Sequence, residues 1–332
     1  MAQLKDDCFA FSGALLPIAD VERLIAERIV PVDGIEEVPL AGARGRVVAR
    51  DVIAPVDLPP FDNSAVDGYA VRHADLAPQA ETRLRLAQRI MAGERAVHSV
   101  TAGEAARIFT GAPMPAGADT VFMQEDTREE GDRVILPQGL ARGANRRLAG
   151  EDIARGALAL PAGRRLRPGD LALAAALGVT HLPVRRRVRV ALFSTGNEVV
   201  DPGEALGVAG VFDSNRVLLA AMLDAVGAQV ADLGILRDDP AALSRAIADA
   251  AAAHDLILTS GGVSLGDADH VRTAVEGIGR LVFWRVGIKP GRPVAMGVIP
   301  SKDGGAAAFA GLPGNPVAVF VTFARVVRPL LL

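Results

Sequence analysis

Short apolar runs alternate with alanine-rich segments of helical periodicity from residue 188 onward. In one such segment, Leu243, Ile247 and Ala250 recur at the spacing that places side chains on one face of a helix. Asp239 and Pro240 precede it, where an N-cap and a first helical residue are typical. Strands separated by helices of this length favour a mostly parallel sheet covered on both faces. The predicted strands are 188–194, 230–236, 255–260, 280–286 and 306–312.

Two further helices are expected in this half of the chain. Leu218, Met222 and Val226 recur at helical spacing after Asp213 or Ser214, either of which suits an N-cap. The last helix is predicted to open at 315–316, where Asn-Pro precedes a long apolar run.

The first half of the chain has a different pattern. A short helix is expected at about 18–29, and β-like segments interrupted by proline and glycine follow it. Gly- and Arg-rich turns resume at 145–180 and include a helical stretch at 170–177. We therefore predict a multi-domain chain of the α/β plus β-rich class, in which the ends of the first half form a further, discontinuous element.

Length and composition limit the classes of function that are compatible with the chain. The 332 residues are half apolar, which is enough for two or three domains. The net charge of -3 disfavours nucleic acid as a partner. The single cysteine, Cys8, excludes an intrachain disulfide and a multi-cysteine metal site. The acidic N-terminus differs from a secretory signal, and the longest apolar segment, 171–179, is too short for a membrane span. We expect a soluble cytoplasmic protein.

The loops that follow the predicted strands are polar and rich in glycine. Because ligands of open parallel sheets bind outside the carboxyl ends of the strands, five such loops at one edge indicate a binding crevice. Ser-Gly-Gly can expose backbone N–H groups to a phosphate, and two cations across a Pro-Gly turn can converge on one oxyanion. For any one loop, an ordinary turn explains the composition equally well. The candidate ligand-binding residues are Ser194, Thr195, Gly196, Ser260, Gly261, Gly262, Ser264, Lys289, Arg292, Pro313, Gly314, Asn315 and Pro316.

Carboxylates on the same loops suggest a metal. Asp239 is expected to be used as an N-cap, which leaves Asp238 free to face the crevice. Glu198 and Asp269 lie on two other crevice loops. Hard oxygen ligands of this kind suit a Mg²⁺ ion that bridges phosphate groups. Each acid taken alone could equally be a solvated surface charge.

Eight segments, in order along nearly the whole chain, resemble the molybdopterin molybdenumtransferases, the MoeA and gephyrin E-domain family. Any one of them is a weak signal, and together they are very specific. The segments are FDNSAVDGYAV (61–71), IFTGAPMPAGADTVFMQED (108–126), NRRLAGEDI (145–153), ALFSTGNE (191–198), FDSNR (212–216), TSGGVSLGDAD (259–269), IKPGRP (288–293) and GLPGNPV (311–317).

The resemblance implies an activity and an architecture. Members of the family insert molybdate into adenylylated molybdopterin in a Mg²⁺-dependent hydrolysis that releases AMP and yields molybdenum cofactor. They are elongated homodimers, whose partners could include molybdopterin adenylyltransferase and molybdoenzyme maturation proteins. By analogy we expect a segmented dimerisation domain (1–55 and 145–184), a β-rich domain (56–144) and an α/β molybdopterin-binding domain (185–332). The C-terminal β domain usual in the family is not expected within residues 1–332, so the sequence is expected to be either a short member of the family or a fragment.

The family's functional residues can be carried over by motif position. They fall on Asp67, Thr110, Asp152, Glu198, Asp238 and Asp269, with Glu198, Asp238 and Asp269 as the metal ligands. The first three would face the last three of the other subunit across a shared cleft. Sequence alone does not separate metal ligand from general base.

Three positions differ from the family's usual residues, and two other functions remain open. Asn197 stands where Asp is common, Arg292 where Lys is frequent, and Ala318 where Ser often follows GNPV. A scaffold protein of the same fold is one alternative, although the retained acids argue against it. A molybdopterin adenylyltransferase is the other, but such an enzyme would lack residues 1–184.

Overall fold

The computed structural model describes residues 16–261, 270–290, 293–301 and 304–332. These residues divide into two compact units. Unit 1 contains the described residues up to Glu37, the short segment Gly45–Val47, and Pro183–Leu332. Unit 2 contains Val38–Arg44 and Val48–Leu182.

Unit 1 is built on a six-stranded sheet. Four neighbouring strands are parallel, as the alternating pattern predicts, and β19 runs antiparallel to the strands on either side of it. The carboxyl ends of the other five strands therefore share one edge. In spatial order the strands are β16 (Gln229–Leu236), β13 (Arg189–Thr195), β17 (Leu256–Ser260), β20 (Ala306–Leu312), β19 (Pro293–Pro300) and β18 (Arg280–Arg285).

Strand β19 is absent from the strands predicted above. Its run VAMGVIP contains Gly297, which weakens a strand assignment. A Cβ at Gly297 would lie 2.7 Å from the Arg280 carbonyl oxygen, so glycine is what permits the close pairing with β18. Strands β18 and β19, which are consecutive in the chain, therefore pair antiparallel.

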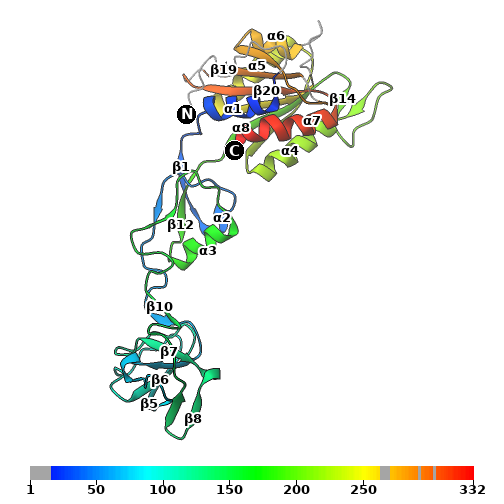
Figure 1. Cartoon of the computed structure of the whole chain (residues 1–332). Coiled ribbons are helices and arrows are strands. Elements are labelled where there is room, and N and C mark those ends of the chain that lie inside the picture. Colours follow the sequence, from blue (N-terminus) through cyan, green and yellow to red (C-terminus); the bar gives the residue numbers. More distant parts are fainter. Residues whose placement is uncertain (1–15, 262–269, 291–292, 302–303) are drawn as a thin grey trace. The chain divides into compact units, whose positions relative to one another are not determined.

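Helices cover both faces of this sheet (Figure 1). One face carries α1 (Ile18–Arg28), α4 (Ser214–Val226), α7 (Pro316–Thr322) and, beyond a π-helical turn at Phe323–Val327, α8 (Arg328–Leu331). The other carries α5 (Pro240–Ala253) and α6 (His270–Glu276). Along β13, Val190 and Leu192 enter the first core and Ala191 and Phe193 the second. This alternation is what a strand buried on both faces requires.

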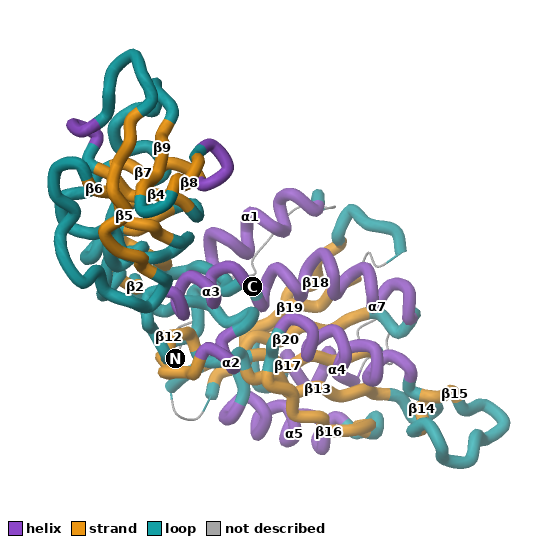
Figure 2. Tube along the Cα trace, turned by 90° about the horizontal axis from the view of Figure 1, so that it is seen from below, coloured by secondary structure: helices purple, strands orange, loops and turns teal. Residues whose placement is uncertain are grey.

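A short arm follows β13 in the same unit. Val199–Val200 (β14) pairs in parallel with Val211–Phe212 (β15), and the arm extends beyond the end of the sheet in Figure 2. The Arg216 guanidinium, only 12% exposed, joins Asp201 of the arm to Asp213 and Asp232. Asp213 also caps α4 by accepting the Arg216 amide N–H, which confirms the first of the two predicted N-caps.

Unit 2 contains a second six-stranded sheet. Its two faces carry separate cores: Tyr69 and Val71 of β4 enter one, and Ala70 enters the other. A 3-10 turn, η2 (Gln124–Asp126), follows β7. In spatial order the strands are β7 (Thr120–Met123), β4 (Gly68–Val71), β6 (Glu104–Ile108), β5 (Thr82–Ile90), β9 (Arg133–Leu136) and β8 (Arg128–Glu130).

Short strand pairs connect this sheet to the rest of the chain. The strand pairs bring the segment before the sheet beside the segment after it. In the second of these segments, Arg164 and Asp170 form an ion pair at 2.9 Å near the start of α3 (Pro168–Ala176). The helix α2 (Leu40–Ala43) is also in this region. The pairs are β3 (Asn63–Ser64) with β10 (Arg146–Arg147), β2 (Val52–Ile53) with β11 (Leu158–Leu160), and β1 (Ile35–Pro39) with β12 (His181–Arg185).

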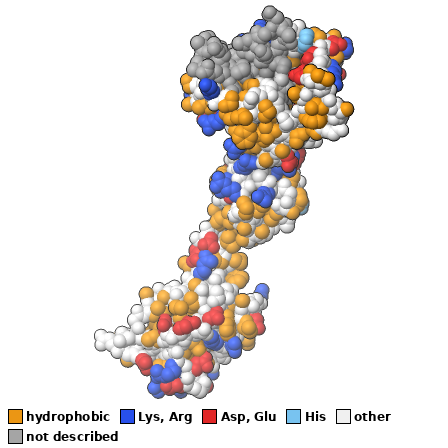
Figure 3. Space-filling view, turned by 90° about the vertical axis from the view of Figure 1, so that its right-hand side faces the viewer, with side chains coloured by type: hydrophobic (Ala, Val, Ile, Leu, Met, Phe, Trp, Pro, Cys, Tyr) orange, Lys and Arg blue, Asp and Glu red, His pale blue; other side chains and the backbone are white. Residues whose placement is uncertain are grey.

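The surface mixes charges of both signs. Figure 3 shows acidic and basic side chains on the visible face, in keeping with a net charge of -3. Of the helices that the structure describes, none has both the length and the hydropathy needed to cross a membrane.

Candidate functional site

Asp67 lies in the turn that leads into β4 and is held by Thr110. The Thr110 amide N–H and hydroxyl both donate to Oδ1 of Asp67, at 2.8 and 2.7 Å. These two bonds, together with the positive charge of Arg107, hold the pKa of Asp67 below its ordinary value of 3.8. The carboxylate is therefore ionised at neutral pH, with one oxygen committed to Thr110 and the other available to a ligand.

The backbone on either side of Asp67 is also fixed. The Gln124 amide N–H donates to the Asp67 carbonyl oxygen at 3.0 Å. Gly68 packs so closely on β7 that a Cβ would lie 1.7 Å from the Phe122 carbonyl oxygen. Only glycine fits there, which explains the Asp-Gly pair in the 61–71 segment.

Asp152 is in the same unit as Asp67 but binds a different residue, Arg147. It is exposed and forms an ion pair with Arg147 of β10 at 2.6 Å. Arg147 also binds Glu151, whose pKa is lowered first by the Leu148 N–H and then by Arg147. Because Arg147 pairs with Asn63 of β3, Asp152 is tied to the strand just before the Asp67 turn.

Asp62 precedes this turn and binds the 146–149 segment. Its Oδ1 accepts the Ala149 N–H at 2.8 Å, and its Oδ2 pairs with Arg146. The Ala149 N–H and Arg146 lower the pKa of Asp62 despite partial burial. Asp62 is thus fully used in joining the 61–64 segment to the 146–149 segment.

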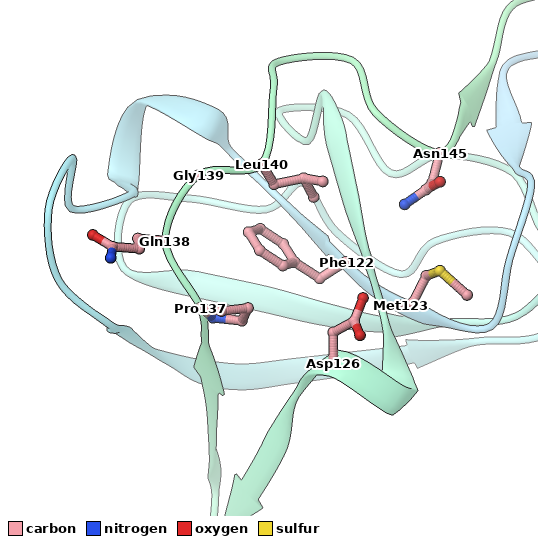
Figure 4. Close-up of a pocket in the computed structure, with 8 residues that line it drawn as sticks. All are labelled: Phe122, Met123, Asp126, Pro137, Gln138, Gly139, Leu140 and Asn145. Atoms are coloured by element: carbon pink, nitrogen blue, oxygen red, sulfur yellow. The ribbon is translucent and has the colours of Figure 1, made fainter.

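A cavity of about 380 Å³ lies beside β7 of unit 2 (Figure 4). Met123, which pairs with Gly68, forms part of its wall together with Phe122, Pro137 and Leu140. Asp126 and Asn145 supply carboxylate and amide groups to the lining. Asn145 has a left-handed φ of 56° and donates from Nδ2 to the Val121 carbonyl at 3.0 Å. None of the predicted ligand-binding residues lines this cavity.

In unit 1, Ser194 and Thr195 end β13 at the carboxyl edge of the sheet. Both are buried, and among the described residues neither hydroxyl has a hydrogen-bond partner. Buried polar groups normally have partners, so an unpartnered pair at a sheet edge favours a ligand as the missing partner. Gly261, after β17, is close enough for a Cβ to lie 3.0 Å from the Thr195 carbonyl oxygen.

Asn215 joins three elements at the same edge. Its Nδ2 donates to Ser260 Oγ at 2.8 Å and to the Gly314 carbonyl at 2.7 Å. Its Oδ1 is buried and has no partner in the part of the chain that the structure describes. The predicted binding loops at 260–261 and 313–316 are therefore brought together by a residue of α4.

Glu198 and Asp238 come from neighbouring loops. The Asn197 N–H donates to Asp238 Oδ2 at 3.2 Å, and Arg237 donates to the Asn197 carbonyl at the same distance. The Glu198 carboxylate folds back toward β13, where a Cβ at Gly196 would lie 2.8 Å from its Oε2. Carboxylate oxygens of this type suit Mg²⁺. Within the described ranges, however, no three metal-binding side chains converge.

Asp239 and Asn315 both cap helices, as expected. Asp239 Oδ1 accepts the N–H groups of Ala241 and Ala242 at 2.9 and 3.1 Å, which lowers its pKa and leaves Asp238 as the acid of the crevice loop. Asn315 Oδ1 accepts the N–H groups of Val317 and Ala318 at 3.0 and 3.1 Å. The N–H of Ala318 is therefore hydrogen-bonded to the Asn315 cap.

The predicted site residues that the structure describes form two groups, one in each unit, and the remaining ones are not described. Asp67 contacts Thr110 in unit 2, while Ser260, Gly314 and the 194–198 and 238 loops share one edge of unit 1. Lys289 is exposed before a cis Lys289–Pro290 bond. Gly262, Ser264, Asp269 and Arg292 lie outside the described residues.

Three contributing residues were absent from the sequence-based site. Asn215, Gln124 and Arg107 all support or complete a predicted group. Asn215 was inside the quoted FDSNR segment, so the resemblance pointed to its position but not to its contacts. Gln124 likewise lies in the 108–126 segment, and Arg107 directly precedes it. These two residues act through a backbone N–H and a guanidinium, and no composition pattern reveals such contacts.

Two family models match the chain. The first, described as the MoeA N-terminal region (domain I and II), matches residues 16–178. The second, described as a probable molybdopterin binding domain, matches residues 191–332.

Curated relatives and solved structures agree with these matches. The molybdopterin molybdenumtransferase of Haemophilus influenzae is 39% identical over 89% of this chain and 72% of its own length. The enzyme of the same name from a Nostoc species is 38% identical over 95% of this chain and 73% of its own. A crystal structure of a MoeA protein of molybdopterin biosynthesis from Pyrococcus horikoshii superposes with a TM-score of 0.80 at 30% identity, covering 96% of this chain and 78% of that one.

Proposed function

The chain belongs to the family of molybdopterin molybdenumtransferases, and from this premise we propose that it inserts molybdate into adenylylated molybdopterin and releases AMP. The family places it among the transferases of molybdenum cofactor biosynthesis. The observation that best supports ligand binding is the set of three buried, unpartnered polar atoms at the carboxyl edge of the unit 1 sheet: Ser194 Oγ, Thr195 Oγ1 and Asn215 Oδ1.

The proposed reaction breaks the phosphoanhydride bond of the substrate. An oxygen of water or of molybdate attacks one of the two phosphorus atoms, and the bridging P–O bond breaks. AMP takes the attacking oxygen if its own phosphorus is attacked and the bridging oxygen if the phosphorus of the pterin is attacked, and the pterin keeps its phosphate in both cases. An attacking water releases its proton to solvent. If water is the nucleophile, Asp67 is suited to orient it, because Thr110 fixes Oδ1 of Asp67 and leaves Oδ2 to accept a hydrogen bond from that water. The Ser194 and Thr195 hydroxyls can donate to phosphate oxygens.

Mg²⁺ is the metal that the proposal requires. Glu198 and Asp238 carry the hard oxygen donors that Mg²⁺ prefers, and their loops are hydrogen-bonded to one another through Asn197. With Asp269, they would hold the ion against the substrate's phosphates. When bound, the ion would neutralise negative charge on those phosphates.

We further propose that the working form is a cytoplasmic homodimer. In this arrangement Asp67, Thr110 and Asp152 of one subunit act with Glu198, Asp238 and Asp269 of the other. The basis is the resemblance to the family, together with the finding that these two sets of residues belong to different units of the chain. Lys289, Arg292 and the turn at 311–316 are the proposed contacts of the molybdate oxyanion and the terminal phosphate of the pterin.

The experiment that tests the function is AMP release by the purified protein. Given adenylylated molybdopterin, Mg²⁺ and molybdate, the protein should release AMP, measured by chromatography, and release should depend on both molybdate and Mg²⁺. Bound substrate with no AMP release would favour a scaffold protein over an enzyme. Failure to bind the substrate would contradict the proposal altogether.

A further inference from the structure

Arg107 of β6 connects the two backbone segments that meet at Asp67. Its Nη1 donates to the Gly68 carbonyl at 3.0 Å, and its Nη2 donates to Gln124 Oε1. The Gln124 N–H in turn donates to the Asp67 carbonyl at 3.0 Å. The two peptide carbonyls that flank the start of β4 are therefore both occupied, one by Arg107 and one by a residue that Arg107 binds.

Aromatic rings hold the guanidinium in place. Its central carbon lies 5.0 Å from the ring centre of Tyr69 and 4.8 Å from that of Phe109. Contacts of this kind restrict a long side chain to one orientation and add cation–π attraction. Tyr69 stands opposite Arg107 in the strand register, so the ladder itself aligns the two side chains.

Arg89 provides a natural comparison. It stands opposite Arg107 on the neighbouring strand β5, and its guanidinium lies 4.7 Å from the centre of the same Phe109 ring. Only Arg107, of these two arginines, donates to the Asp67 turn. The contact with Phe109 is shared by both residues, whereas the contact with Tyr69 and the link to Asp67 belong to Arg107.

We propose that Arg107 is a positioning residue that fixes the Asp67 carboxylate for the reaction. Thr110 holds Oδ1, Gln124 holds the Asp67 carbonyl, and Arg107 holds both Gln124 and the next carbonyl. The planar fork of arginine reaches two acceptors at once, which the single ammonium of lysine does not reproduce. The catalytic part of this inference rests on the proposed function, and the structural part does not.

The test compares Arg107→Lys with Arg89→Lys in the full chain. Both substitutions keep the charge and a stem beside Phe109, so they differ in the link to Asp67 and in the contact that Arg107 alone makes with Tyr69. Arg107→Lys should lower kcat about 10- to 100-fold while changing the KM for adenylylated molybdopterin less than about threefold, because small misplacements of a catalytic group cost this much. Arg89→Lys should leave both constants within about twofold of the native values, since none of its known contacts reaches the turn.

Amide hydrogen exchange, followed by NMR, gives a readout that needs no turnover. In Arg107→Lys the Thr110 and Gln124 amides, which both bind Asp67, should exchange at least about tenfold faster, while the Ala106 and Val71 amides of the ladder keep their rates. If Arg107→Lys fails to fold, Gln124→Met is the alternative variant, because it removes the side-chain oxygen that accepts from Arg107 and changes only an exposed side chain. Gln124→Met should raise the exchange rates of the Thr110 and Gln124-position amides, but less strongly than Arg107→Lys. Unchanged exchange at Thr110 and Gln124 in the folded variant would overturn the positioning role. Faster exchange with no change in kcat would mean that Arg107 stabilises the turn but does not position Asp67 for the reaction. Absence of AMP release by the native chain would count against the proposed function and not against the structural role of Arg107.

Discussion

At the scale of single residues, the Asp67–Thr110 contact gives the site a carboxylate that stays charged. We predict that Thr110→Val lowers kcat about tenfold, because it removes the hydroxyl that orients Oδ1 and retains only the amide N–H. The pKa of Asp67, now lowered below 3.8 by both Thr110 donors, should rise toward that value. Asp67 loses its charge only as the pH falls through this pKa, so its titration should not affect the rate between pH 6 and 8 in either protein. Thr110→Ser, which keeps the hydroxyl, is the control; a Thr110→Val enzyme of native kcat would contradict the assignment.

Asp255, just before β17, makes a second residue-scale prediction possible, this time about stability. It accepts from both terminal nitrogens of Arg186, at 2.6 and 2.9 Å, and from the Arg189 N–H at 2.8 Å. Burial alone would raise the pKa of Asp255, but these donors hold it below 3.8. Asp255→Ala should lower the free energy of unfolding by about 2–3 kcal/mol, because it leaves a half-buried arginine without its partner.

The pH dependence of that loss has a definite sign. A carboxyl whose folded pKa is depressed contributes stability above its unfolded pKa, and the contribution disappears as the pH falls through the folded value. The difference between native protein and Asp255→Ala should therefore be full at pH 7 and shrink below about pH 4. Urea unfolding at several pH values measures it. A difference that grows on acidification would refute the ion pair as the cause.

Single residues also show where sequence reasoning reaches its limit. The choice of Asp239 as helix cap, and hence of Asp238 as the crevice acid, followed from the position of Asp239 before Pro240, and the cap is confirmed. Asn215 could not be found this way, because its partners Ser260 and Gly314 are 45 and 99 residues away in sequence. Contacts between residues so far apart in sequence depend on the order of the strands in the sheet. The periodicity of apolar residues does not predict that order.

At the scale of elements, adjacent residues of one loop should separate stability from activity. Asp239→Ala removes the acceptor for two N–H groups at the start of α5 and should lower the melting temperature without changing turnover per folded molecule. Asp238→Ala removes a crevice carboxylate and should reduce turnover about 100-fold or more with little change in melting temperature. Scanning calorimetry and the AMP assay measure the two effects. If both variants lost activity to the same extent, the division between cap and site would be wrong.

The elements themselves were predicted unevenly. Strands β13, β16, β17 and β20 were found because each is a mostly apolar run with a helix after it, and their parallel pairing follows from those crossovers. β19 was missed because it is the next strand after β18 in the chain and pairs antiparallel with it, outside that alternating pattern. The strand pairs of unit 2 are only two or three residues long at β2, β3, β10 and β11, too short for a period to be read.

At the scale of the whole molecule, the predicted division of residues 1–184 into a segmented domain and a β-rich domain stays a prediction. The chain separates into two compact units, and the first family model spans two named domains within residues 16–178. The segmented path has a visible basis, because β2 and β3 pair with β11 and β10 from the other end of the first half. The sequence motifs give the candidate residues, and the fold assigns these residues to the two units.

The shared-cleft proposal makes the last prediction. If Asp67 acts with Glu198 and Asp238 of the other subunit, then Asp67→Ala and Glu198→Ala homodimers should each be inactive, since each lacks one half of both sites. Mixed and allowed to exchange subunits, they should form heterodimers with one intact and one doubly altered site. Such a mixture should recover about a quarter of native AMP release, because half of the dimers are mixed and each carries one working site of two.

Two controls make that result decisive. Asp67→Ala mixed with a chain carrying both substitutions should stay inactive, because no pairing of these chains yields an intact site. Size-exclusion chromatography with tagged subunits establishes that exchange has occurred. With exchange demonstrated, an inactive mixture of the single variants would mean that Asp67 and Glu198 serve the same site from the same chain.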